Sequence, residues 1–224
     1  SFSASYFTYM DRYPDFTVYV DNGPPTVITY TPVHNRIHQI GLDASYFAGG
    51  FDIRTEWAVN LTKDFDGESP VEKNPYILGV IQASRSFFNS TTTLSLAWSP
   101  RVVLNYKAPS DYLIPSDEQS AEMIRKYDGQ AYPWENALSF RAAGKYWNET
   151  LQPELLFLAE TGARDWFGTL SIAYQLSDGV SIKAGTAQYG SFLKSGDPDR
   201  ELGTFSKSTA IDNDYYYIEV KISF

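Results

Sequence analysis

Few residues in this chain carry side chains suited to acid–base catalysis. The two histidines, His34 and His38, come just before or within one strand-like segment, and the carboxylates of Asp212 and Asp214 precede another. A hydrolase needs a base that a carboxylate orients, together with a nucleophile or an activated water. No nucleophile motif accompanies these residues, so we expect no enzyme. A pairing of His38 with Asp212 or Asp214 at one rim is the weaker alternative.

A larger set of charged residues recurs at every second position of strand-like segments. Side chains at alternate positions share one face of a strand, so these charges would line a single surface. If the strands enclose an open pore, these charges would set which ions and solutes pass through it. In a narrow closed barrel they would instead form salt bridges that fill the interior. The set comprises Asp43, Asp52, Arg54, Glu56, Arg141, Lys145, Glu154, Glu160, Lys183, Glu219 and Lys221.

Two acidic runs in the expected loops have carboxylates two residues apart. They contain Asp64 and Asp66, followed by Glu68, and Asp197 and Asp199, followed by Glu201. Oxygen ligands at such spacing suit Ca²⁺, but neither run has a complete EF-hand pattern. Solvated acidic loops are the main interpretation, and we expect neither a metal nor a cofactor.

The elements that position these residues are strands with period-two alternation. Residues 51–61 place Phe51, Ile53, Trp57 and other apolar side chains on one side, with Asp52, Arg54 and Glu56 on the other. The same pattern recurs, more weakly in the first two segments, in 1–10, 76–87, 39–46, 93–98, 138–146, 151–160, 169–176, 180–184 and 215–224. The face assignment of 76–87 stays open. The sequence therefore predicts an all-β chain with about ten antiparallel strands in a single domain, residues 1–224.

The connections alternate between short and long. Short turns fall at 48–50, 88–91, 147–150 and 177–179, and longer loops at about 11–35, 63–74, 99–136, 161–166 and 190–213. This layout is typical of a transmembrane β-barrel with periplasmic turns and external loops. A soluble sandwich is the alternative, but strands of roughly 9–12 residues exceed its usual length. Both termini are then expected on the periplasmic side of a bacterial outer membrane.

One helix is expected, over residues 115–129 in the longest loop. Ser116 is a candidate cap with Gln119 three residues later, and Met123 and Ile124 give a small apolar face. Such a helix either folds inward as a constriction or decorates an external loop.

The composition of the chain excludes several classes of partner and site. A net charge of −9 argues against nucleic acid, and the absence of cysteine excludes disulfides and thiolate sites. No apolar run is long enough for a membrane helix, and mean hydropathy is −0.32. Aromatic residues make up 16% of the chain, which suits strands or interfacial anchoring.

The C-terminal segment YYYIEVKISF resembles the last-strand signature of bacterial outer-membrane proteins. Its apolar row ends the chain and consists of Tyr216, Ile218, Val220, Ile222 and Phe224. The resemblance implies that the barrel assembly machinery recognises this row.

Residues 31–59 resemble a family of proteobacterial outer-membrane proteins that is defined as a domain of unknown function. The opening FSASYF and the ending DNDYYYIEVKISF resemble the C-terminal half of those proteins, which have about twice this length. The resemblance implies a C-terminal piece of a larger barrel or a shortened relative, with suspected passage of hydrophobic compounds. The matching residues are Arg36, Ile37, Gly41, Asp43, Arg54, Glu56 and Ala58.

The functional expectation is a porin-like channel that passes small molecules through a charge-lined lumen. The alternative is a closed, salt-bridged barrel whose acidic, Tyr-rich loops bind a partner or lipopolysaccharide through divalent cations. Expected partners are outer-membrane lipid and lipopolysaccharide, the assembly machinery, a small permeant, and a second chain or an N-terminal segment that completes the barrel.

Overall fold

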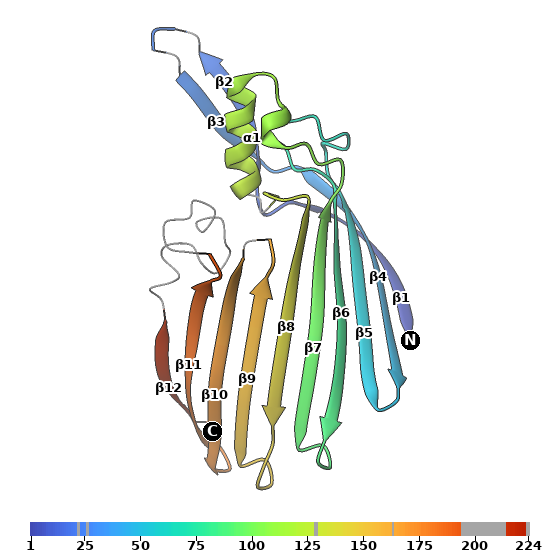
Figure 1. Ribbon diagram of the computed structural model, residues 1–224, viewed down its shortest axis with the longest axis vertical. Helices are drawn as coiled ribbons and strands as arrows, with labels where there is room; N and C mark the ends of the chain where they lie inside the picture. Colours follow the sequence, from blue (N-terminus) through green and yellow to red (C-terminus); the bar gives the residue numbers. More distant parts are fainter. Residues whose placement is uncertain (22, 26, 128–129, 163, 194–213, 223–224) are drawn as a thin grey trace.

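The computed structural model is all-β and antiparallel, with one large sheet, one separate hairpin and a single α-helix. It describes residues 1–21, 23–25, 27–127, 130–162, 164–193 and 214–222. Figure 1 shows the long strands side by side, with short turns at one end and the hairpin and helix beyond the other. We call these the turn end and the cap end.

The large sheet contains ten strands, as the alternation in the sequence predicted. Each strand pairs antiparallel with its neighbour, and the spatial order is β1, then β4 through β12. The strands are β1 (Phe2–Met10), β4 (Arg36–Ala48), β5 (Phe51–Leu61), β6 (Tyr76–Phe87), β7 (Thr92–Val103), β8 (Trp134–Gly144), β9 (Leu151–Glu160), β10 (Asp165–Ser177), β11 (Val180–Ser191) and β12 (Tyr215–Ile222).

The sheet is open. Within the described residues β1 pairs only with β4 and β12 only with β11, so these two strands form the edges. Figure 1 places them on opposite sides of the sheet. The ten strands are therefore not joined edge to edge into a closed barrel.

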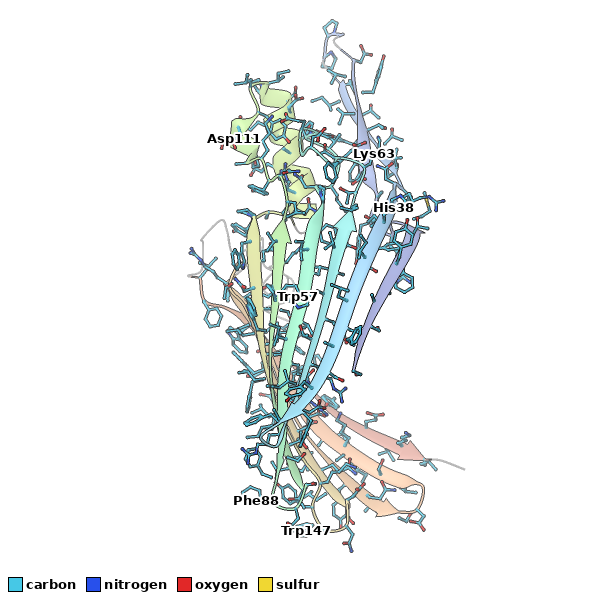
Figure 2. The ribbon with its side chains drawn as sticks, turned by 90° about the vertical axis from the view of Figure 1, so that its right-hand side faces the viewer. His38, Trp57, Lys63, Phe88, Asp111 and Trp147 are labelled. Atoms are coloured by element: carbon cyan, nitrogen blue, oxygen red, sulfur yellow. The ribbon has the colours of Figure 1, made fainter. Side chains whose placement is uncertain are left out.

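Four tight turns connect strands at the turn end, as the sequence predicted. Gly49 and Gly50 link β4 to β5 with φ of 58° and 81°, values that favour glycine. The turns 88–91 and 147–150 share one conformation, with three successive positive-φ residues that begin at Phe88 and at Trp147. In each turn the fourth amide donates to the first carbonyl at 3.2 Å. Figure 2 shows Phe88 and Trp147 at this end, opposite Lys63 and Asp111.

The cap end contains a hairpin that the sequence pattern did not predict. The connection 11–35 forms the hairpin of β2 (Asp15–Asp21) and β3 (Val27–Val33) instead of an irregular loop. The connection between β9 and β10 spans only 161–164, which is shorter than expected. We call residues 11–35, 62–75 and 104–133 the outer cap.

The expected helix is present and begins at residue 115 as expected, but its cap differs. The helix α1 (Pro115–Tyr127) follows the 3-10 turn η1 (Pro109–Asp111), and proline occupies the first helical position, where its missing N–H costs nothing. Ser116 therefore lies inside the helix, where its carbonyl accepts the Ser120 hydroxyl, and the expected Ser116 cap is wrong. Gln119 is likewise inside the helix rather than in a capping box.

Among the described side chains of α1, three are buried. Ser120, Ala121 and Arg125 are buried in the outer cap, and Figure 1 shows α1 beyond the cap ends of β7 and β8. The helix therefore lies at the cap end, outside the span of the ten paired strands. The side chains of Met123 and Ile124 lie outside what the structure describes.

One face of the sheet is apolar and exposed across all ten strands. The register aligns Leu42 with Trp57 and Leu96 with both Ala83 and Phe140, so apolar residues share this face. Trp57 covers Gly79 on β6, where a β-carbon would lie 2.5 Å from the indole ring. Its large exposed members include Phe2, Tyr6, Leu42, Tyr46, Leu96, Leu138, Leu170, Ile172, Tyr216 and Ile218.

Candidate functional site

The opposite face of the sheet gathers the charged residues that the alternation predicted. Asp43 lies directly opposite Glu56, and Ser45 lies opposite Arg54. On the far strands Glu154 lies opposite Ser171, and Lys183 lies opposite both Ala173 and Glu219. Register alone therefore puts charged residues of β4, β5, β9, β11 and β12 on this polar face.

The acidic part of the polar face surrounds a groove of about 490 Å³ between β1 and β6. Glycine at position 41 leaves space in the groove, because a β-carbon there would lie 2.5 Å from the Ser5 hydroxyl oxygen. Ser3 donates to Asp43, while Glu56 makes no ion pair among the described residues. The two facing carboxylates leave this groove negatively charged.

Other predicted charges form ion pairs along the polar face. Arg54 donates to Asp52 at 2.8 Å, and Arg141 donates to Glu154 at 2.6 Å. These pairs are partly exposed and contribute little to stability. One pair lies within β5 and the other joins β8 to β9.

Lys145 lies between the end of β8 and the tight turn 147–150. Its backbone amide donates to the Thr91 carbonyl at 2.7 Å, so pairing with the neighbouring strand continues past Gly144. Its ammonium pairs with Glu149 at 3.0 Å.

Arg101, Glu135 and Asp165 were missed as members of the polar face. Arg101 and Glu135 lie opposite each other with charged atoms 3.6 Å apart, and Asp165 lies opposite the predicted Glu160. All three lie in the segments 99–136 and 161–166, which were expected to be loops. The β-branched Val102 and Val103 after Arg101 were the signal that β7 continues.

Aromatic residues also occupy the polar face, on its β10–β12 side. Phe167 packs against Tyr189 with ring centroids 4.8 Å apart, and Tyr215 lies 6.0 Å from Tyr217. Leu156 and Tyr217 line a second hollow with Lys183. Aromatic rings and an ammonium therefore lie together on this part of the polar face.

The C-terminal apolar row lies on the apolar face, as expected. Tyr216 and Ile218 are 80% and 78% exposed, and Val220 and Ile222 are also exposed. Glu219 and Lys221 lie on the polar face of the same strand, where Lys221 is opposite Ser181. Phe224 lies outside the described residues.

Among the described residues, neither histidine is hydrogen-bonded to a carboxylate. The phenol of Tyr6 hydrogen-bonds His38 Nδ1 at 2.7 Å on the apolar face, and His34 Nδ1 lies 2.7 Å from the Asp11 carbonyl. Asp214 accepts the Tyr189 amide at the other edge of the sheet, so the structure does not bring it to His38. Asp212 lies outside the described residues.

The carboxylates of the 64–68 run do not converge on a cation. Asp64 is buried and accepts the amides of Glu68 and Ser69, while the Glu68 carboxylate pairs with Lys107. Asp66 is exposed, and the described residues contain no cluster of three metal-ligating side chains. Asp197 and Asp199 lie outside the described residues.

Burial raises the pKa of Asp64 even though two backbone amides donate to it. A raised folded-state pKa means that this group favours folding below its unfolded pKa of about 3.9. That contribution is lost as pH rises through the folded pKa. The loop therefore tolerates, rather than requires, the ionised carboxylate.

The outer cap has its own polar core around Lys73. The Lys73 ammonium, only 5% exposed, donates to Asp11 at 2.7 Å and to the Tyr13 carbonyl at 2.5 Å, with Asp15 at 3.7 Å. Asn35 donates to the other oxygen of Asp15 at 2.7 Å. These contacts fix the hairpin connection to the 62–75 loop.

A second polar cluster attaches the helix connection. The buried Arg125 donates to the Asn74 side chain at 2.9 Å and to the Tyr112 hydroxyl at 3.2 Å. Gln130 pairs with the backbone of Asn74 through both its amide atoms. Burial raises the pKa of the Tyr106 phenol, whose ring lies 4.9 Å from Arg125. The three loops thus fold as one unit.

Among the described residues, no helix combines the length and hydropathy required to cross a membrane. Comparison with protein-family models, with curated proteins and with solved structures found no match to this chain.

Proposed function

We propose that this chain is part of the wall of a bacterial outer-membrane β-barrel, a porin-like channel that passes small molecules. The observation that carries the proposal is the exposed apolar face, which continues over ten strands opposite a charged face. Soluble proteins rarely expose apolar patches larger than a few hundred Å². Hydrocarbon would cover this face without a further protein layer.

Both edges of the sheet require strands from elsewhere. Unpaired backbone amides and carbonyls cannot face lipid, so β1 and β12 would pair with further strands. A second chain or a segment of the same polypeptide outside these residues would supply them. β1 runs toward the cap end and β12 away from it, so an even number of added antiparallel strands completes the ring.

The orientation follows from the connections. The tight turns would face the periplasm and the outer cap would face outside, as in other barrels with short and long connections. The C-terminal apolar row would be the contact for the barrel assembly machinery. Lipid and lipopolysaccharide would surround the wall.

Ion selectivity tests the role of the polar face. Replacing Glu56 with lysine changes the charge of the acidic groove by two units. A unit charge about 6 Å from an ion in water is worth about 0.7 kcal/mol. The two-unit change shifts K⁺ and Cl⁻ by about 1.4 kcal/mol each in opposite directions, so the K⁺/Cl⁻ permeability ratio should fall by up to about a hundredfold, and by less at salt concentrations that screen the charge. The readout is the reversal potential of single channels in planar bilayers under a salt gradient.

The control substitution is Glu118→Lys, which makes the same charge change on α1 in the outer cap. It should leave the permeability ratio near that of the unmodified channel. If the assembled protein gives no conductance, and liposome swelling shows no solute entry, the passive aqueous pore is rejected.

The outer cap favours a second candidate function, a binding module. Its buried Lys73 and Arg125 clusters give three loops one fixed shape, which unstructured loops would not have. Lipopolysaccharide with Mg²⁺ is the ligand to test. Binding that persists after residues 109–127 are replaced with a short glycine–serine linker, in a protein that still inserts, would exclude α1 from that role.

A further inference from the structure

The apolar face carries one cation near the turn end. Pairing of Ser84 with Asp52 puts even-numbered residues of β6 on the polar face, so Arg85 points the other way. Among the described strand residues of the sheet, the only other arginine or lysine on this face is Arg36, at the cap end of β4. The sequence pattern of 76–87 was ambiguous because Arg85 interrupts its apolar row.

Two aromatic rings hold the Arg85 guanidinium. Its central carbon lies 5.0 Å from the Phe51 ring centroid on β5 and 5.2 Å from that of Phe87 on β6. Gly50 leaves room beside it, since a β-carbon there would lie 3.5 Å from Arg85 Nε. Cation–π contacts orient the group without neutralising its charge.

The structure offers Arg85 no anion. Arg85 is exposed, and within the described part of the chain it forms no ion pair. Carboxylates of the neighbouring strands, such as Asp52, lie on the polar face on the other side of the sheet. A fixed guanidinium with free N–H groups therefore faces outward beside the aromatic turn end.

We propose that Arg85 forms a binding site for the phosphate of a phospholipid in the leaflet at the turn end. The planar guanidinium fork matches phosphate oxygens, and long cationic side chains near a membrane boundary extend toward headgroups. Phe51 and Phe87 would contact the adjoining acyl-chain region. The inference rests on the proposed membrane function, because only then does lipid reach this face.

The test first asks whether the protein resists carbonate extraction from phosphatidylcholine vesicles. Native mass spectrometry then counts dioleoylphosphatidylglycerol retained by the detergent-purified protein and by the variants Arg85→Gln, Arg85→Lys and Arg54→Gln. Arg54 lies on the polar face and serves as the matched control. We expect about tenfold weaker retention for Arg85→Gln, an intermediate loss for Arg85→Lys, and no change for Arg54→Gln.

The outcomes separate the two proposals. Extraction by carbonate would overturn the membrane function, and with it this site. Stable insertion with equal lipid retention in Arg85→Gln and the unmodified protein would overturn the lipid site alone. Competition by excess inorganic phosphate that removes the bound lipid would identify a general phosphate site, and persistence of the lipid supports headgroup binding.

Discussion

Replacing Lys73 with methionine is expected to unfold the outer cap while the ten-stranded sheet stays paired. The change leaves Asp11 and Asp15, both buried, without the ammonium that lies between them. Removing one partner of a buried ion pair typically costs about 3–5 kcal/mol. Amide hydrogen exchange should lose protection in 11–35 and 62–75, and keep it in β9 to β11.

Lys63→Met provides the control for Lys73→Met. Lys63 pairs with Glu72 in the same loop, but its side chain is 59% exposed. Hydrogen bonding to Glu72 raises the pKa of Lys63, yet solvent screens such a pair, and its loss should cost less than about 1 kcal/mol. Equal protection in Lys73→Met and Lys63→Met would contradict the proposed role of the buried cluster.

Replacing Leu96 with arginine is expected to produce the second largest loss of stability. Leu96 is 58% exposed at the middle of β7 on the apolar face. In a barrel wall, arginine at the centre of the bilayer costs about 2–4 kcal/mol. Urea titration of the protein folded into phospholipid vesicles measures that difference directly.

Ala97→Arg is the matched control on the next residue. Ala97 lies on the polar face between Gln82 and Ser139. An arginine there would reach water and neighbouring polar groups, so its cost should be well below that of Leu96→Arg. If Ala97→Arg were the more harmful change, the polar face would be the buried one and the account would be wrong.

The strands and their faces were predictable because both depend on local alternation. Where alternation is strong, as in β5, the register confirms the expected faces. The assignment of faces from alternation failed in β6, where Gly79 and Arg85 interrupt the apolar row. The alternation also placed the end of β7 too early in the chain, since Pro100 gives no apolar-versus-polar signal.

The outer cap was not predictable because its core is polar. Lys73, Asn74 and Arg125 look like solvated loop residues in sequence, yet each is at most 5% exposed. Each has a partner 51–62 residues away in the chain. Alternation carries no information on contacts of that range, and a polar side chain gives no sign that it will be buried.

The alternation pattern also could not predict whether the sheet closes on itself. Apolar rows specify which face each strand presents, but not which strand joins β1 to β12. The free edges of the sheet therefore had to be observed.

Accessibility of spin labels along β7 tests the central claim most directly. The chain has no cysteine, so single-cysteine variants at Leu94, Ser95, Leu96 and Ala97 each give one labelling site. In phospholipid vesicles we predict that labels at 94 and 96 collide mainly with oxygen, which concentrates in hydrocarbon, while those at 95 and 97 collide mainly with a water-soluble nickel complex. Labels at 94 and 96 that are shielded from both reagents, or reached mainly by nickel, would contradict contact between the apolar face and lipid.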